Sequence, residues 1–136
     1  MVKYADLDRI MIEIKQQGSI TSDIIKQLTK IVSMEKFLSA MEKITLEQLH
    51  KFIFSPSSRV IWIVNGKERD YLVYPKRFCS CMDFYLQGVV KNAKYYCKHL
   101  LAQQIFVNLE EKLVRKAFIE LNDDKFNSIL KKVNIL

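Results

Sequence analysis

The chain has 136 residues, of which 49% are hydrophobic and 27% charged. This length suits one domain with its own core, and the composition excludes a disordered or collagen-like chain. The longest apolar run, residues 60–64, is far shorter than the roughly 20 residues of a membrane-spanning helix. The net charge of +7 lies mostly in residues 51–100, which hold nine basic and three acidic residues.

Several function classes can be excluded at this level. The three glycines, Gly18, Gly66 and Gly88, lie too far apart for a dinucleotide-binding or P-loop motif. A self-contained nucleotide-binding site of either type is therefore excluded, and any ATP dependence has to come from a partner. We also expect no small-molecule substrate. The first residues lack the apolar stretch of a secretory signal. We expect an intracellular protein without membrane contact, in the cytoplasm of a prokaryote or the nucleus of a eukaryote.

The N-terminal part, residues 1–50, is predicted to be helical. Apolar residues recur at helical spacing over residues 4–16, and Gly18 suits the left-handed position that ends a helix. Thr21, Ser22 or Asp23 can cap a second helix, whose apolar stripe continues to Met41. Thr45 can cap a short turn through residue 49.

The central part, residues 51–102, changes to β-branched and aromatic residues. Three such runs, residues 51–54, 59–64 and 69–74, are separated by residues 55–58 and by Asn65-Gly66. Asn-Gly is a strong hairpin signal because both residues tolerate positive φ. We predict a three-stranded antiparallel meander with Trp62 in the core, followed by a short helix at residues 82–90.

The C-terminal part, residues 103–136, is again predicted to be helical. One helix is expected from Cys97 to about Leu121, and Asn122 or Asp123 can cap a last helix. The long helix is apolar on several sides, so it either forms a dimer interface together with the last helix or is covered by the N-terminal helices. The predicted fold is a single α+β domain, residues 1–136, which can form a homodimer when alone.

All three cysteines and one of the two histidines fall into two short pairs. Cys79 and Cys81 form a C-x-C pair, and Cys97 and His99 form a C-x-H pair fifteen residues later. An extended C-x-C places both thiols on one face of the chain, and a helix beginning at Cys97 can direct two further ligands to the same point. Thiolates and a neutral imidazole are the ligands that Zn²⁺ prefers, at about 2.0–2.3 Å.

Two other interpretations stay open. The thiols can be buried apolar side chains. Alternatively, Cys97 is a nucleophile, with His99 as its base and Asp83 as the orienting carboxylate. Structural zinc is favoured, because a nucleophile pair does not need two further cysteines. Four protein ligands leave no position for a reactive water, so no catalytic residue is assigned.

The pattern resembles the SWIM zinc-finger family. Beyond the four ligands, the similarity includes residues 54–60 and Leu100-Leu101-Ala102, and it covers about residues 52–104. Met82 stands where many SWIM fingers have proline. Within the family, the chain is similar to the small, archaeal-like subunits of Shu-type recombination complexes. This resemblance implies a role in homologous recombination, in which members of the family pair with a RecA-family recombinase paralogue and help the recombinase assemble on single-stranded DNA.

Basic and aromatic residues surround the proposed zinc ligands. Phosphates require positive charge and unstacked bases require a flat ring, so these residues are candidates for contact with single-stranded DNA. The alternative is that the lysines are only solvated and that a tyrosine packs against the zinc site. Arg59 is a weaker candidate, and His50 has no companion ligand. The candidates are Lys76, Arg77, Lys91, Lys94, Tyr95 and Lys98.

The residues predict one structural Zn²⁺, and the resemblance implies a non-enzymatic accessory subunit in homologous recombination and DNA repair. It is expected to bind the recombinase paralogue through apolar helix surface and DNA through the basic face. Two alternatives remain, a protein-interaction zinc module without DNA contact and a sequence-specific regulator.

Overall fold

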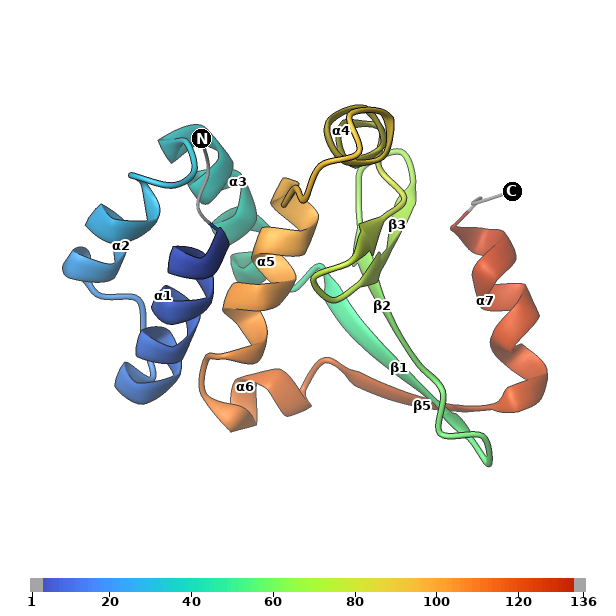
Figure 1. The fold of residues 1–136 in the computed structure, drawn as a ribbon. Helices are drawn as coiled ribbons and strands as arrows, with labels where there is room; N and C mark the ends of the chain where they lie inside the picture. The colour runs from blue at the N-terminus through green and yellow to red at the C-terminus, as the bar shows by residue number, and fades with distance from the viewer. Residues whose placement is uncertain (1–3, 134–136) are drawn as a thin grey trace.

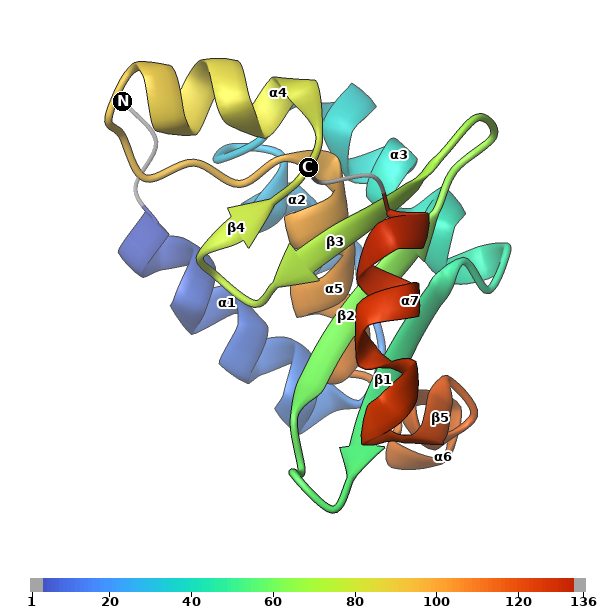
Figure 2. The same ribbon diagram turned by 90° about the vertical axis from the view of Figure 1, so that its right-hand side faces the viewer.

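The computed structural model describes residues 4–133, which form an α+β fold. Helices α1–α3 pack on one side of helix α5, and the five-stranded sheet lies on the other side of α5 (Figure 1). Helix α7 lies across the opposite face of the sheet (Figure 2). The helices of this framework are α1 (Tyr4–Gln17), α2 (Ser22–Leu28), α3 (Met34–Thr45), α5 (Lys98–Val107), α6 (Glu111–Arg115) and α7 (Phe126–Lys132).

The N-terminal helices begin and end largely at the predicted residues. Gly18 has a φ of +73° and donates its N–H to the carbonyl of Ile14, which closes α1. The Thr21 hydroxyl accepts from the Ile24 N–H and caps α2. The single second helix predicted to Met41 is wrong, because the chain leaves helical geometry after Leu28 and Ser33 caps a new helix, α3. Thr45 is the last residue of α3; a turn follows at residues 46–47, and the chain is already extended in β1 from Leu49.

The sheet contains the predicted meander and two further strands. Strands β1, β2 and β3 pair antiparallel, and β4 continues this pattern at the β3 edge. Strand β5 pairs parallel with β1 at the other edge, so the sheet is mixed rather than three-stranded and antiparallel. The strands are β1 (Leu49–Ser55), β2 (Val60–Asn65), β3 (Asp70–Tyr74), β4 (Phe78–Cys79) and β5 (Phe118–Asn122).

The long helix predicted from Cys97 to Leu121 is much shorter in the structure. Helix α5 ends at Val107, a separate short α6 follows, and residues 118–122 are extended in β5. The register pairs Phe118 with Lys51 and Leu121 with Phe54. Pairing with the open edge of β1 satisfies backbone groups that a helix would otherwise satisfy locally, so the sheet decides the conformation of this segment.

Helix α5 is buried on all sides within the chain. Residues 99–106 are all buried, with α1 and α3 on one side and the sheet on the other. The apolar surface of α5 is therefore explained by the covering N-terminal helices, and α5 is not available as a dimer interface. Helix α7 covers a second, smaller core around Phe54, where the rings of Phe54 and Phe126 meet edge to face at 5.1 Å. In residues 4–133, no helix has the length and apolar character needed to cross a bilayer.

The turn between β2 and β3 requires a glycine for space rather than for positive φ. Gly66 does not have the left-handed φ expected for an Asn-Gly turn. Instead, a Cβ at this position would lie 2.5 Å from the Arg69 carbonyl oxygen and 2.9 Å from Cε2 of Tyr71. The hairpin prediction is confirmed by the pairing of Asn65 with Asp70, but its conformational reason is wrong.

We expect Gly66→Ala to lower the free energy of unfolding by about 1–3 kcal/mol, the usual cost of overpacking. The backbone at Arg69 has to move, because the nearest clashing atom is not a flexible side chain. Urea unfolding followed by circular dichroism measures the loss. Lys67→Ala, at an exposed position of the same turn, is the control and should unfold at the wild-type midpoint. Equal midpoints for both variants would contradict the crowded turn.

Candidate metal centre

The four predicted ligands come together at one end of α5. Cys79 lies on β4, and Cys81 precedes the short helix α4 (Met82–Phe84). Cys97 precedes α5, and His99 lies in its first turn. Their ligand atoms all lie within 4.8 Å of one another, and all four residues are buried. Within residues 4–133, no other group of three or more such side chains is placed to hold a metal ion.

The distances fit a tetrahedral zinc site. Bonds of about 2.3 Å to sulfur and 2.0–2.1 Å to nitrogen place neighbouring ligand atoms about 3.5–3.8 Å apart. The Nδ1 of His99 lies 3.6 Å from Sγ of Cys79 and 3.9 Å from Sγ of Cys97. Nδ1 therefore faces the thiols and is the coordinating nitrogen. The four side chains are positioned to bind one Zn²⁺ ion.

Two ligands also cap the helices that follow them. Sγ of Cys81 accepts from the Phe84 N–H at 3.4 Å, and Sγ of Cys97 accepts from the Leu100 N–H at 3.5 Å. These N–H groups have no partner within the helix, and they stabilise negative charge on sulfur. Each of these hydrogen bonds acts to lower the pKa of its sulfur, although the pKa of Cys97 as a whole is raised within the crowded, buried cluster.

Protonation of the cluster follows from its crowding. Hydrogen bonds with Cys81 and Cys97 raise the pKa of Cys79, whereas hydrogen bonds from Cys79 and Cys97 lower the pKa of Cys81. Without metal, the Cys81 thiolate thus accepts hydrogen bonds from the thiols of Cys79 and Cys97. A metal cation can take the place of the two thiol protons. Burial lowers the pKa of His99, so its imidazole is neutral, as a zinc ligand must be.

Two lysines of α3 lie beside the cluster. Lys43 is buried and Lys36 is half-buried, and desolvation lowers the pKa of both. The charge of Cys97 acts in the opposite direction on each lysine. Three thiolates around Zn²⁺ carry a net charge of −1, which these two ammonium groups offset. Sequence analysis missed both lysines, although they face the same side of α3 as the buried Phe37, Ala40 and Ile44.

Lys36 also connects the two ligand-bearing segments. Its Nζ donates to Oη of Tyr95 at 2.7 Å and to the carbonyl of Tyr96 at 2.9 Å, and it lies 4.1 Å from the centre of the Tyr95 ring. Oη of Tyr95 donates to Asp83 at 2.8 Å. This chain of contacts joins α3, the segment before Cys97 and the helix after Cys81. Asp83 therefore orients Tyr95. Asp83 is not seen to contact His99, so the interpretation of Cys97 as a nucleophile gains no support.

We expect Lys36→Met to weaken the domain by about 1–2 kcal/mol, since it removes two charge-assisted hydrogen bonds from a half-buried position. Zinc should remain bound, but a competing chromogenic chelator should extract it faster. The comparison is Lys30→Met, at an exposed position between α2 and α3. Identical extraction rates for the two variants would rule out a supporting role for Lys36.

The remaining side chains around the centre are packed rather than reactive. The ring of Tyr71 stacks on His99 with centroids 4.3 Å apart. Tyr96, which directly precedes the ligand Cys97, is buried. Trp62 is buried and meets Phe106 edge to face, which confirms its place in the core.

The proposed nucleic-acid residues are mostly exposed, but several have partners within the chain. Lys76, Arg77, Lys91, Lys94 and Lys98 are all exposed. Nζ of Lys76 lies 3.7 Å from Asp8, and Nζ of Lys91 donates to Gln87. Tyr95 is half-buried and engaged by Lys36 and Asp83, as described above.

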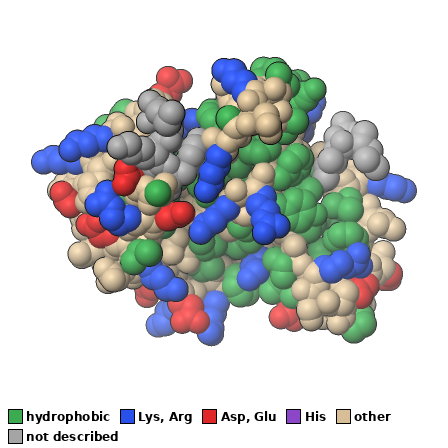
Figure 3. Space-filling model, viewed as in Figure 1, with side chains coloured by type: hydrophobic (Ala, Val, Ile, Leu, Met, Phe, Trp, Pro, Cys, Tyr) green, Lys and Arg blue, Asp and Glu red, His purple; other side chains and the backbone are tan. Residues whose placement is uncertain are grey.

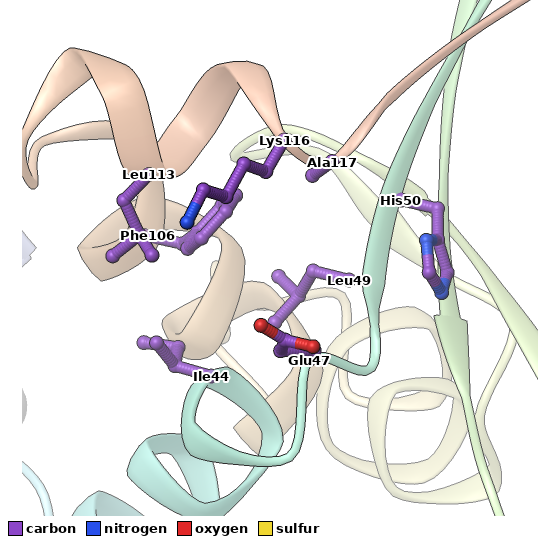
Figure 4. Close-up of a pocket in the computed structure, with 8 residues that line it drawn as sticks. All are labelled: Ile44, Glu47, Leu49, His50, Phe106, Leu113, Lys116 and Ala117. Carbon is purple, nitrogen blue, oxygen red and sulfur yellow. The ribbon is translucent and has the colours of Figure 1, made fainter.

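Residues outside the centre have other contacts. The guanidinium of Arg59 lies over the ring of Phe126 and near Asp123. His50 Nε2 lies 2.6 Å from Oδ1 of Asn65. An apolar pocket of about 260 Å³ lies at the opposite end of α5 from the ligands. Figure 4 shows Glu47 and Lys116 reaching toward its apolar lining, while His50 lies to one side.

The comparisons with known proteins agree with this geometry. No protein-family model matches the chain. A curated relative from Dictyostelium discoideum, described as zinc finger SWIM domain-containing protein 7 homolog, is 29% identical over 129 residues, which span 93% of this chain and 80% of that protein. The two ligand pairs and their buried cluster fit a SWIM zinc finger, and the chain is similar to this SWIM domain-containing protein along most of its length.

Proposed function

We propose that this protein is an accessory subunit of homologous recombination and DNA repair that pairs with a RecA-family recombinase paralogue. The observation that carries the proposal is the buried cluster of four ligands in SWIM spacing, together with similarity to a SWIM protein along 93% of the chain. The recombination role follows from the resemblance of residues 52–104 to small subunits of Shu-type complexes.

The proposed role is non-enzymatic. Four protein ligands complete a tetrahedral shell, so a zinc ion bound here has no open position at which water could be activated. The centre instead fixes the end of the β-meander against the start of α5. Its contribution is then to folding and to the placement of surface side chains around it.

We further propose that the basic residues near the centre contact single-stranded DNA. Between Lys76 and Lys98 the chain contains five basic residues and one acidic residue, Asp83. Asp83 already accepts a hydrogen bond from Tyr95. Figure 3 shows Lys and Arg side chains gathered between the N-terminal helices and the sheet. The contacts of Tyr95 indicate that phosphate binding by the lysines matters more than stacking on this ring.

Salt dependence tests the DNA contact. Binding of a labelled single-stranded oligonucleotide should weaken as salt rises, with log K falling by about 0.7 per phosphate contact for each unit of log salt. A flat response, or equal binding of polyglutamate, would support the protein-interaction module instead. Strong preference for one duplex sequence would support a sequence-specific regulator.

Purification from the native cell tests the protein partner. We expect a RecA-like ATPase to co-purify, together with one zinc per chain, when the tagged full chain is isolated and analysed by mass spectrometry. Recovery of the zinc-loaded chain without any such ATPase would contradict the proposed pairing.

A further inference from the structure

The helix that follows the zinc ligand Cys81 presents an unusual apolar face. It consists of α4 and the π-helical segment Tyr85–Val90. Phe84 and Gly88 are the buried residues of this helix, whereas five large apolar side chains are 48–69% exposed. Figure 3 shows hydrophobic side chains around this helix at the top of the molecule. We call this surface the 82–90 face; its exposed residues are Met82, Tyr85, Leu86, Val89 and Val90.

A groove of about 490 Å³ runs along this helix. The buried residues Cys79, Cys81 and Phe84 form its floor, and Met82 and Val89 belong to the 82–90 face. Arg69, from the turn before β3, also lines it and is exposed. A concave apolar surface with one cation at its edge suits an apolar side chain carried beside an acidic one.

The 82–90 face is held in place by the surrounding structure. A Cβ on Gly88 would lie 3.3 Å from the Phe84 ring, so the helix packs closely on itself. Phe84 meets Phe78 edge to face at 5.7 Å, and Asp83 is bound by Tyr95. Cys81 caps the helix from within the metal centre. A preformed surface loses little conformational entropy on binding, which favours association.

The charges around the face select the occupant. Arg69 lines the groove and Lys91, which donates to Gln87, follows the helix, whereas Asp83 in the same helix accepts from Tyr95. A second copy of this chain would bring the same positive charge to the interface. Nucleic acid satisfies the cations and could stack a base on Tyr85, but it has little to bury against the four non-aromatic side chains of the face. An acidic amphipathic protein helix satisfies both requirements.

We propose that the 82–90 face and its groove dock an amphipathic helix of another protein, with its apolar side chains in the groove and its acidic side chains beside Arg69 and Lys91. This inference rests on the part of the proposed function in which the chain pairs with a protein. It does not depend on DNA binding or on the nature of that protein.

Selection of helical peptides tests the docking surface. The zinc-loaded full chain is presented with a phage-displayed library of short peptides whose apolar positions recur at i, i+3, i+4 and i+7 and whose other positions are random. We expect acidic residues to be enriched at the flanking positions. Binding of the selected peptide should fall about thirtyfold or more in Leu86→Asp, the loss expected at a hot spot, and Arg69→Glu should also weaken it.

Controls separate docking from folding. Val89→Asp, at a second exposed position of the face, should reproduce the effect of Leu86→Asp, and both variants should keep one zinc and the wild-type melting temperature. Ile12→Asp, at a comparably exposed apolar position of α1, should bind the peptide as the wild type does. Enrichment of basic peptides, failure to enrich any peptide, or equal loss in Ile12→Asp would overturn the proposal.

The test of the docking surface can fail independently of the test of the recombination partner. If a RecA-like ATPase co-purifies equally with the wild type and with Leu86→Asp, the pairing stands and that ATPase docks elsewhere; the docking surface itself is overturned if the peptide selection also fails. If the peptide binds as expected but no such ATPase is recovered, the surface stands and the recombination partner is wrong. Loss of DNA binding in Leu86→Asp, without any peptide selected, would assign the face to nucleic acid.

Discussion

Replacing Cys97 by serine is expected to remove the zinc ion and to abolish cooperative folding. Structural zinc contributes about 10–16 kcal/mol of binding free energy in small zinc domains, which is comparable to the entire stability of a typical domain, about 5–15 kcal/mol. Even a loss of 5 kcal/mol would lower the melting temperature by about 15 °C or more in a chain of this size.

Serine makes this test specific for the metal. Sγ of Cys97 also caps α5 by accepting from the Leu100 N–H, and a serine hydroxyl is among the preferred N-cap groups. The helix cap is therefore retained, whereas one of the four zinc ligands is lost. Zinc content by mass spectrometry and thermal unfolding by circular dichroism measure the result, and wild-type protein treated with a chelator should lose its cooperative unfolding transition in the same way.

Met82→Ser is the matched control. Met82 is next to a ligand in sequence but 69% exposed, so it tests substitution beside the centre without altering coordination. It should keep one zinc per chain and the wild-type melting temperature. A Cys97→Ser variant with those same two properties would show that the cluster does not hold the fold together.

The second large effect concerns the basic surface. The triple variant Lys91→Glu, Lys94→Glu and Lys98→Glu changes the net charge from +7 to +1 at positions that are all exposed. If each lysine neutralises one phosphate, the slope of log K against log salt should fall by about 2. We expect affinity for a single-stranded oligonucleotide at low salt to fall by about a hundredfold or more, with zinc content unchanged.

A matched triple variant separates a local site from net charge. Lys15, Lys26 and Lys30 are also exposed, and they lie among the N-terminal helices away from the zinc centre. Their replacement by glutamate produces the same net charge, so only long-range attraction should weaken. Fluorescence anisotropy across a salt series compares the two variants. Equal losses in both would remove the zinc-side surface from the DNA proposal.

The metal centre could be predicted almost completely from the sequence. Its ligands lie in two pairs one residue apart, so the chain's own geometry places each pair, and thiolate and imidazole chemistry selects the metal. The Thr21 cap and the β1–β3 meander were predictable for the same reason, since capping and hairpin pairing depend on residues close in sequence. The partners Lys36 and Tyr95, 59 residues apart, gave no such local signal.

Residue types and short spacings determined the zinc ligands, the helix caps and the strand-forming segments of this protein. Only the tertiary structure decided that residues 118–122 become β5, that α5 is enclosed by α1, α3 and the sheet, and that the helix at residues 82–90 stays uncovered. The physical reason is that local preferences amount to a few tenths of a kcal/mol per residue, whereas strand pairing and burial depend on which distant surfaces meet.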